Sequence, residues 1–352
     1  MIAMSIEKIA FGTTKGCKAV ELYTIKNAAG ASAEILTYGG TLQALSMPDK
    51  HGLFKDITIG FDDLEGHLER SDYQGQLVGR YANRIANGEF EINGKRYHVT
   101  KNEKGATCLH GGGELSHAVW DAVPLGDNAL KLSYISPAGS HGFPGELKVE
   151  TVYTLTDENE LIIDYSAVSD EDTVINLTNH TYFNLAGYDA GNVLEHVLQI
   201  SADYFTPTDS ASIPTGELRT VKGTPFDFTV PKAIGLNIGA DDEQLLNCRG
   251  YDHNFCLNTR AKDISAAVVR EPVSGRVMEM FTDLPGVQLY TGNFLDNIPG
   301  KGGNLMGKHA GFCLETQFFP DTPNQPSFPQ CTFKAGEEFR TRTSFKFSTY
   351  MA

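Results

Sequence analysis

The stretch LKVETVYTLTDENELIIDYSAV, residues 147–168, decides the fold class. Side chains alternate in character over 147–155 and again over 161–168, with the period of a β-strand that buries one face. Between these two segments, Thr-Asp-Glu-Asn at 156–159 supplies turn-forming side chains. The pattern therefore predicts a long antiparallel hairpin.

Similar short strand patterns recur along the chain, separated by Gly, Asn, Asp and Pro, whereas helical periodicity is hard to find. They lie at 33–37, 42–47, 90–92, 130–135, 193–200, 266–269, 277–281, 287–290, 311–318 and 344–347. Residues 205–235 and 297–308 are expected to be loops, and no fixed-period repeat or linker interrupts the pattern. We therefore expect an all-β fold, a single large antiparallel β-sandwich that forms one domain over residues 1–352.

Composition limits the class of protein. The 352 residues are 41% hydrophobic and 21% charged, which excludes a mainly disordered chain because enough apolar surface is available for a core. The balance of 29 Lys and Arg against 44 Asp and Glu gives a net charge of −15. This charge disfavours a nucleic-acid binder or a protein held on an anionic membrane, and a neutral small molecule suits it better.

Location and redox state are also predicted. Residues 1–8 show no basic region followed by an apolar run, and no segment approaches the ~20 apolar residues of a membrane span, so we expect a cytoplasmic protein. The six cysteines include no Cys-x-x-Cys pair and are expected to be unpaired thiols.

Two glycine-rich segments imitate functional motifs without completing them. His110-Gly111-Gly112-Gly113 has the form of a lipase oxyanion-hole segment, but the chain has no Gly-x-Ser-x-Gly nucleophile elbow. Residues 302–308, GGNLMGK, imitate a phosphate-binding loop, but His309 stands where Ser or Thr would bind magnesium. Since His-Glu-x-x-His is absent as well, we expect no metal, nucleotide or other cofactor.

The segment TVINLTNHTYFNL, residues 173–185, is expected to present a polar face. In an extended strand one side would carry Asn176, Thr178, His180, Tyr182 and Asn184. Hydrogen-bonding groups, an imidazole and an aromatic ring together suit the hydroxyls and the C–H face of a sugar. A solvated outer face is the alternative interpretation of this segment.

Three other segments also place polar side chains on strands. They carry Glu315 with Gln317, Gln288 with Tyr290, and Asp252 within an aromatic frame. Each is an ordinary surface feature when taken alone. In an all-β chain without basic patches, the combination indicates a concave carbohydrate-binding groove.

The order of short motifs resembles the aldose 1-epimerase family, also called the galactose mutarotase family. The matching blocks are GRYANRI at 79–85, LHGG at 109–112, NLTNHTYFNL at 176–185, GYDHNF at 250–255, PGVQLYTGNF at 285–294 and GFCLETQ at 311–317. The resemblance implies a large β-sandwich, often called a supersandwich, which agrees with the strand pattern. It also implies an isomerase that interconverts the α- and β-anomers of galactose or glucose.

The resemblance further implies residue roles. Glu315 matches the general base that takes the proton from the C1 hydroxyl, His180 the general acid that protonates the ring oxygen, and His110 an assisting histidine. The residues that match binders of sugar hydroxyls are Asn83, Arg84, Asp252 and Gln288. A stacking role for Tyr182 rests on the strand pattern alone.

Opening a sugar ring moves two protons, so a carboxylate base and an imidazolium acid on either side of the C1–O5 bond are the minimum apparatus. No metal, nucleotide or covalent intermediate is required. We therefore expect His180 to be protonated near neutral pH and Glu315 to be ionised, with Arg84 favouring its negative charge.

Three other functions stay open at this point. A hexose-6-phosphate epimerase of the same fold would need a cationic phosphate pocket. A glycoside hydrolase could use Asp252 and Glu315 as its carboxylate pair. A non-catalytic sugar-binding sandwich would bind sugars without accelerating mutarotation. The preferred aldose and the oligomeric state are not predicted.

Overall fold

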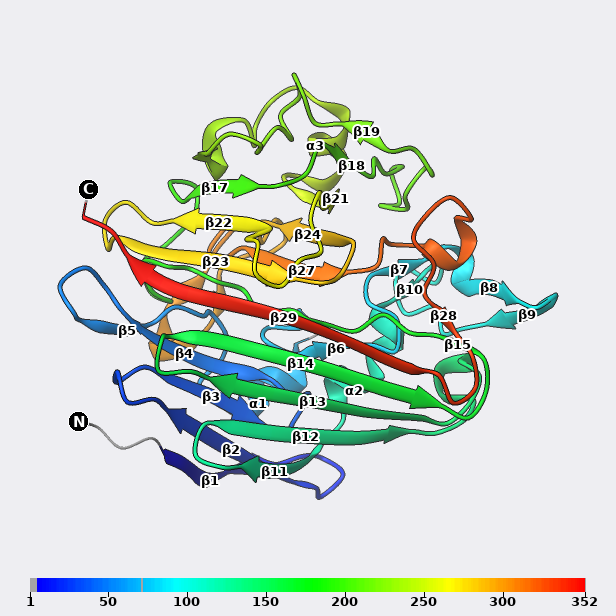
Figure 1. The fold of residues 1–352 in the computed structure, drawn as a ribbon, viewed down its shortest axis with the longest axis horizontal. Helices are drawn as coiled ribbons and strands as arrows, with labels where there is room; N and C mark the ends of the chain where they lie inside the picture. Colours follow the sequence, from blue (N-terminus) through cyan, green and yellow to red (C-terminus); the bar gives the residue numbers. More distant parts are fainter. Residues whose placement is uncertain (1–4, 71, 352) are drawn as a thin grey trace.

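A nine-stranded antiparallel sheet crosses the middle of the molecule (Figure 1). The computed structural model describes residues 5–70 and 72–351. In spatial order the strands of this sheet are β11 (Asp121–Leu125), β12 (Ala129–Ser136), β13 (Leu147–Leu155), β14 (Glu160–Ser169), β29 (Glu338–Thr349), β23 (Arg276–Thr282), β22 (Ala267–Arg270), β17 (Val197–Ile200) and β20 (Lys232–Ala233).

The predicted hairpin forms the centre of one half of this sheet. β13 and β14 pair from Leu147 with Ser169 to Leu155 with Leu161. Along β13 buried side chains alternate with exposed or half-buried ones, which is the period read from the sequence. β29 then pairs with both β14 and β23 and joins the two halves of the sheet.

Two five-stranded sheets accompany the long sheet, and their neighbouring strands are also antiparallel. The first, in blue at the lower left of Figure 1, contains β1 (Ser5–Thr13), β2 (Ala19–Lys26), β3 (Ser32–Leu36), β4 (Leu42–Pro48) and β5 (Phe54–Asp56). The second runs in the order β19 (Arg219–Thr220), β18 (Tyr204–Phe205), β21 (Asp252–Cys256), β24 (Gly286–Tyr290) and β27 (Cys313–Gln317).

One hydrophobic cluster joins the three sheets. It contains Ile25 from the first five-stranded sheet, Ile163 and Met280 from the long sheet, and Val287 from the second five-stranded sheet, all fully buried. Burial of this kind is the main favourable contribution to folding. The prediction of an all-β antiparallel sandwich is confirmed.

Short elements connect the sheets and carry the loops around the pocket described below. The paired short strands are β7 (Arg84–Ile85) with β10 (Cys108–Leu109), β6 (Leu77–Val78) with β16 (Thr178–Asn179), β8 (Glu89–Ile92) with β9 (Lys95–His98), β15 (Thr173–Val174) with β28 (Thr332–Phe333), and β25 (Ile298–Pro299) with β26 (Leu305–Met306). The α-helices of the described residues are the short α1 (Leu64–Glu69), α2 (Glu114–His117) and α3 (Glu243–Cys248).

The segment 173–185 is not one extended strand, so the alternation on which its polar face would depend is interrupted. Only β15 and β16 form regular pairs there, because side-chain amides bond to the backbone between them. Asn176 donates to the carbonyls of Ala82 and Phe318, and Asn184 donates to that of Ala310. These amides therefore fix loops in place, and the segment does not present one continuous polar face.

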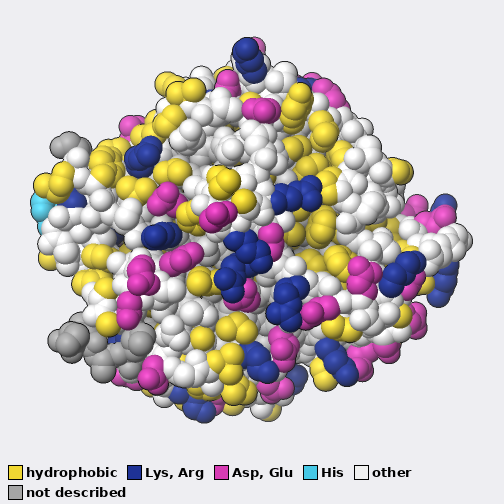
Figure 2. All heavy atoms as spheres, in the orientation of Figure 1, with side chains coloured by type: hydrophobic (Ala, Val, Ile, Leu, Met, Phe, Trp, Pro, Cys, Tyr) yellow, Lys and Arg dark blue, Asp and Glu magenta, His cyan; other side chains and the backbone are white. Residues whose placement is uncertain are grey.

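The surface over the long sheet carries both signs of charge. Figure 2 shows basic and acidic side chains interspersed on this face. Within the long sheet, Arg342 of β29 pairs with Asp164 of β14 at 2.6 Å. The cysteines, all within the described residues, are unpaired as expected. Within residues 5–70 and 72–351, no helix has the length and apolar character needed to cross a bilayer.

The buried His196 predicts an acid-sensitive contribution to stability. Burial lowers its pKa from 6.5 to about 4, so the unfolded chain binds more protons than the native one across that interval, and stability falls as pH falls through it. Relative to His196→Gln, the wild type should therefore lose roughly 3 kcal/mol of unfolding free energy between pH 7 and pH 4.

Urea unfolding of both proteins at several pH values measures this difference. The exposed His51 provides the control, since His51→Gln should follow the wild-type pH dependence. A gap between wild type and His196→Gln that stays constant from pH 7 to pH 4 would contradict the assignment.

Candidate active site

A pocket of about 340 Å³ gathers all of the predicted site residues except Gln288. Its lining includes Asn83, Arg84, His110, His180, Tyr182, Asp252 and Glu315. These residues lie at or next to the ends of strands, apart from Tyr182 in the loop after β16 and Glu315 in the middle of β27. The pocket therefore joins segments that are far apart in the sequence.

Gln288 lies behind this lining. In the register of the second five-stranded sheet it stands between Asn254 and Glu315. Its Nε2 donates to Oδ1 of Asp252 at 2.7 Å, and its Oε1 accepts from Nε2 of Gln317 at 3.2 Å. From the sequence, Gln288 is expected to contact the sugar. In the structure it lies outside the pocket lining and orients Asp252.

Glu315 is the most deeply buried carboxyl group of the pocket, with 2% of its surface exposed. Its Oε2 lies 3.6 Å from Nε2 of His180 and makes no hydrogen bond to any described residue. Burial raises the pKa of Glu315 well above its ordinary value, Asp252 raises it further, and Arg84 opposes them. The protonated form of Glu315 is therefore favoured while nothing donates to the carboxylate.

His180 lies opposite Glu315 and is neutral at neutral pH. Burial lowers its pKa to about 4. Its Nδ1 is 3.5 Å from Sγ of Cys313, and its ring stacks on Tyr182 with the centroids 5.0 Å apart. Burial thus disfavours the charge states expected from the sequence, a protonated His180 and an ionised Glu315, because a buried neutral pair avoids the desolvation of two charges.

His110 is held in a defined tautomer. Its Nδ1 accepts a hydrogen bond from the backbone N–H of Asn83 at 3.2 Å. The proton of the neutral ring must therefore sit on Nε2, which is its remaining polar group. Burial lowers the pKa of His110 well below 6.5, and His180 and Arg84 lower it further. His110 consequently offers the pocket a neutral N–H donor.

The same tautomer argues against a metal ion. Ligand atoms of His110, His180 and Glu315 lie within 4.8 Å of one another, a donor set of the kind that binds zinc. A ligating imidazole nitrogen must contribute a lone pair, yet Nδ1 of His110 already accepts from Asn83 and Nε2 carries the proton. The three groups suit a sugar's oxygen atoms better than a cation.

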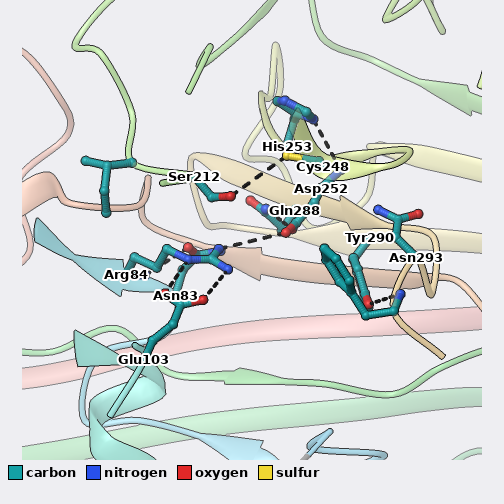
Figure 3. Close-up of polar contacts among 12 residues, drawn as sticks. Asn83, Arg84, Glu103, Ser212, Cys248, Asp252, His253, Gln288, Tyr290 and Asn293 are labelled. Atoms are coloured by element: carbon teal, nitrogen blue, oxygen red, sulfur yellow. Dashed lines mark hydrogen bonds and ion pairs between the residues drawn. The ribbon is translucent and has the colours of Figure 1, made fainter. Parts of the chain in front are cut away.

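Arg84 and Asp252 supply the charged part of the wall (Figure 3). Nη1 of Arg84 lies 3.8 Å from Oδ2 of Asp252. Burial raises the pKa of Asp252, while Arg84 and the hydrogen bond from Gln288 oppose that effect. The ion pair is longer than a hydrogen bond, so a hydroxyl group can bond to both partners.

The sequence did not identify several lining residues. They include Asp72, Tyr73, Glu103, Lys104, Asn247 and Phe294. Tyr73 packs edge-on against His110 with the ring centroids 4.6 Å apart and stacks on His180 at 6.0 Å. Apart from Asn247 in α3, these residues lie outside the named helices and strands, and the segment around Glu103, KNEKG, has the composition of an ordinary solvated loop.

Comparisons with known proteins bear on this pocket. The family model for aldose 1-epimerase matches residues 21–346. The galactose mutarotase of Bos taurus is 43% identical over 348 residues, which cover 98% of this chain and 99% of that protein. The Homo sapiens galactose mutarotase is 45% identical over 317 residues, 90% of each chain. The crystal structure of galactose 1-epimerase from Lactobacillus acidophilus NCFM superposes with a TM-score of 0.88 at 28% identity, over 99% of this chain and 100% of that one.

The hydrogen bonds of the pocket predict the tautomers of both histidines. Nδ1 of His110 accepts from the backbone of Asn83, whereas Nδ1 of His180 can donate to Sγ of Cys313, which leaves Nε2 of His180 free to take up the proton of Glu315. We therefore expect a neutral Nε2–H ring for His110 and a neutral Nδ1–H ring for His180 at pH 7. Long-range ¹H–¹⁵N spectra, assigned with His110→Asn and His180→Asn, measure this directly. An imidazolium signal for either residue at pH 7, an Nδ1–H tautomer of His110 or an Nε2–H tautomer of His180 would refute it.

Proposed function

This chain belongs to the aldose 1-epimerase family, and we propose that its pocket binds an aldose with C1 and the ring oxygen next to Glu315 and His180. It is an isomerase of carbohydrate metabolism that interconverts sugar anomers, as a mutarotase does. The observation that supports the residue assignment is the 3.6 Å approach of a buried carboxyl oxygen without a hydrogen-bond partner among the described residues to a neutral imidazole.

The proposed reaction conserves the number of protons in the site. At neutral pH one titratable proton is shared by the carboxyl group of Glu315 and the imidazole of His180, in addition to the ring proton that a neutral imidazole carries. With that proton on His180, Glu315 accepts the proton of the C1 hydroxyl, the C1–O5 bond breaks as C1=O forms, and His180 protonates O5. Both residues are then in the protonation states favoured by their burial. Closure reverses each transfer after rotation about C1–C2.

Sugar binding provides the reason for the proton to start on His180. A hydroxyl that donates to Glu315 favours its ionised form, and a ring oxygen that accepts from Nε2 of His180 favours the imidazolium. The bound sugar thus supplies hydrogen bonds in place of those with water that Glu315 and His180 lose on burial. The Nε2–H of His110 is assigned to the region of the ring oxygen.

The open aldehyde must stay bound while it rotates. We assign Asn83, Arg84 and Asp252 to hydroxyls remote from C1, where they hold the chain during a turn of about 180°. Tyr182 supports the face of His180 at 5.0 Å, and its hydroxyl donates to the carbonyl of Asp72. Its role is therefore to position His180 as well as to border the sugar.

Galactose and glucose are the proposed substrates. The Bos taurus and Homo sapiens relatives are named galactose mutarotases. Acidic side chains in the lining, Asp72, Glu103, Asp252 and Glu315, outnumber the cations Arg84 and Lys104, which disfavours a sugar phosphate. Rates on galactose and on glucose-6-phosphate separate these two substrate classes.

Two further expectations remain proposals. One domain over residues 1–352 is supported by the hydrophobic cluster that includes residues from Tyr23 to Phe347. The cytoplasmic location expected from the sequence is the other proposal.

Glu315→Gln tests the proposed base. The amide keeps the shape of the carboxyl group but cannot accept the proton, so kcat for mutarotation of α-galactose should fall by about 10²–10⁴-fold. Galactose affinity, measured by calorimetry, should change by only a few-fold because the hydroxyl contacts remain. Polarimetry gives the rate, and the exposed Glu150→Gln is the charge-matched control. Near-wild-type activity of Glu315→Gln would refute the base assignment.

A further inference from the structure

Glu103 is bound to Arg84 by the best-formed ion pair in the pocket. Nε of Arg84 donates to Oε2 of Glu103 at 2.8 Å, and Nη2 donates to Oε1 at 2.9 Å. Both side chains are largely buried, with 12% and 21% exposed. Two parallel bonds of this kind fix the plane of a guanidinium group as well as its position.

Because Glu103 binds Nε and Nη2 of Arg84, the remaining N–H groups of the guanidinium are left for other partners. Among the described residues, Nη1 of Arg84 makes no hydrogen bond, and its nearest charged partner is Oδ2 of Asp252 at 3.8 Å. Figure 3 shows Glu103 and Asp252 on opposite sides of Arg84. The unused N–H groups therefore face the acid and the pocket where a sugar hydroxyl can bridge them.

Glu103 is itself held in place. The hydroxyl of Thr107 donates to its Oε2 at 2.7 Å, and the backbones of the two residues form an isolated antiparallel bridge. The turn between them, through Lys104 and Gly105 at φ 51° and 67°, closes this small loop. The carboxylate is thus presented by a short, internally bonded structure.

We propose that Glu103 is a positioning residue for sugar binding, which aims the Arg84 guanidinium at Asp252 and the pocket. The proposal rests on the function assigned to Arg84 above. Without the two bonds Arg84 can rotate toward Asp252 and close the 3.8 Å gap that a hydroxyl would occupy. Loss of Glu103 therefore weakens binding of the sugar while the reacting pair, Glu315 and His180, stays in place.

Glu103 also has an electrostatic effect on the site. It takes up part of the positive charge of Arg84, which otherwise acts on Asp252 and Glu315. Removing the negative charge of Glu103 leaves Arg84 less compensated, and the ionised form of Glu315 becomes more favourable. The upper pH limit of activity should then move to lower pH.

Two substitutions of Glu103 separate its effect on the orientation of Arg84 from the effect of its negative charge. Glu103→Asp keeps the charge but is one methylene too short for both bonds, whereas Glu103→Gln keeps the length and loses the charge. We expect each to raise KM for galactose by about tenfold with kcat within about threefold, as expected for lost orientation. The alkaline limb of kcat/KM should move to lower pH only in Glu103→Gln. Glu91→Gln, at the exposed position of β8, is the control and should match the wild type.

Arg84→Ala distinguishes failure of this inference from failure of the proposed function. If Arg84→Ala raises KM at least tenfold while both Glu103 variants stay within twofold of wild type, the positioning role is overturned and the sugar-binding role of Arg84 survives. If Arg84→Ala also leaves KM unchanged, the assigned role of Arg84 is wrong. Should the Glu103 variants fail to fold, Thr107→Val, which removes only the supporting hydroxyl, should still raise KM by about two- to threefold.

Discussion

A carboxyl group buried without a bonded counter-charge, Glu315, is the constraint on which the rest of the site depends. Its Oε2 has no hydrogen-bond partner among the described residues, and the nearest ionisable nitrogen is Nε2 of His180 at 3.6 Å. Burial favours the neutral form of each group, so the pair keeps one proton between them. A substrate that donates to one member and accepts from the other can reverse that preference.

The fold explains why such a group can be held. Glu315 lies in the middle of β27, whose neighbour β24 pairs with β21, and the sheet belongs to the same hydrophobic core as the long sheet. A strand of this kind fixes a side chain more firmly than a loop does, so the sheet holds Glu315 in place although burial of its polar group is unfavourable. The groups that contact the outer part of the pocket, such as Glu103 and Phe294, come from turns and strand ends.

The sequence predicted the strands well where alternation was long, as in β13 and β14, because period-two patterns report burial directly. It failed over 173–185, since the amides of Asn176 and Asn184 bond to backbone far away in the chain. The motifs identified Glu315 and His180 but gave charge states that burial disfavours, because the degree of burial is not visible in a motif. Glu103 carried no signal, since its significance lies in the orientation of Arg84.

The pH dependence of kcat/KM for galactose mutarotation tests the central claim most directly, because it reports the protonation of the free enzyme. If Glu315 and His180 share one proton, the rate should stay level across neutral pH, fall on the acid side near 4 as His180 charges, and fall in alkali as Glu315 ionises. A rate that declines above pH ~6.5, the ordinary pKa of histidine, would show that the enzyme needs a preformed imidazolium, and it would contradict the account.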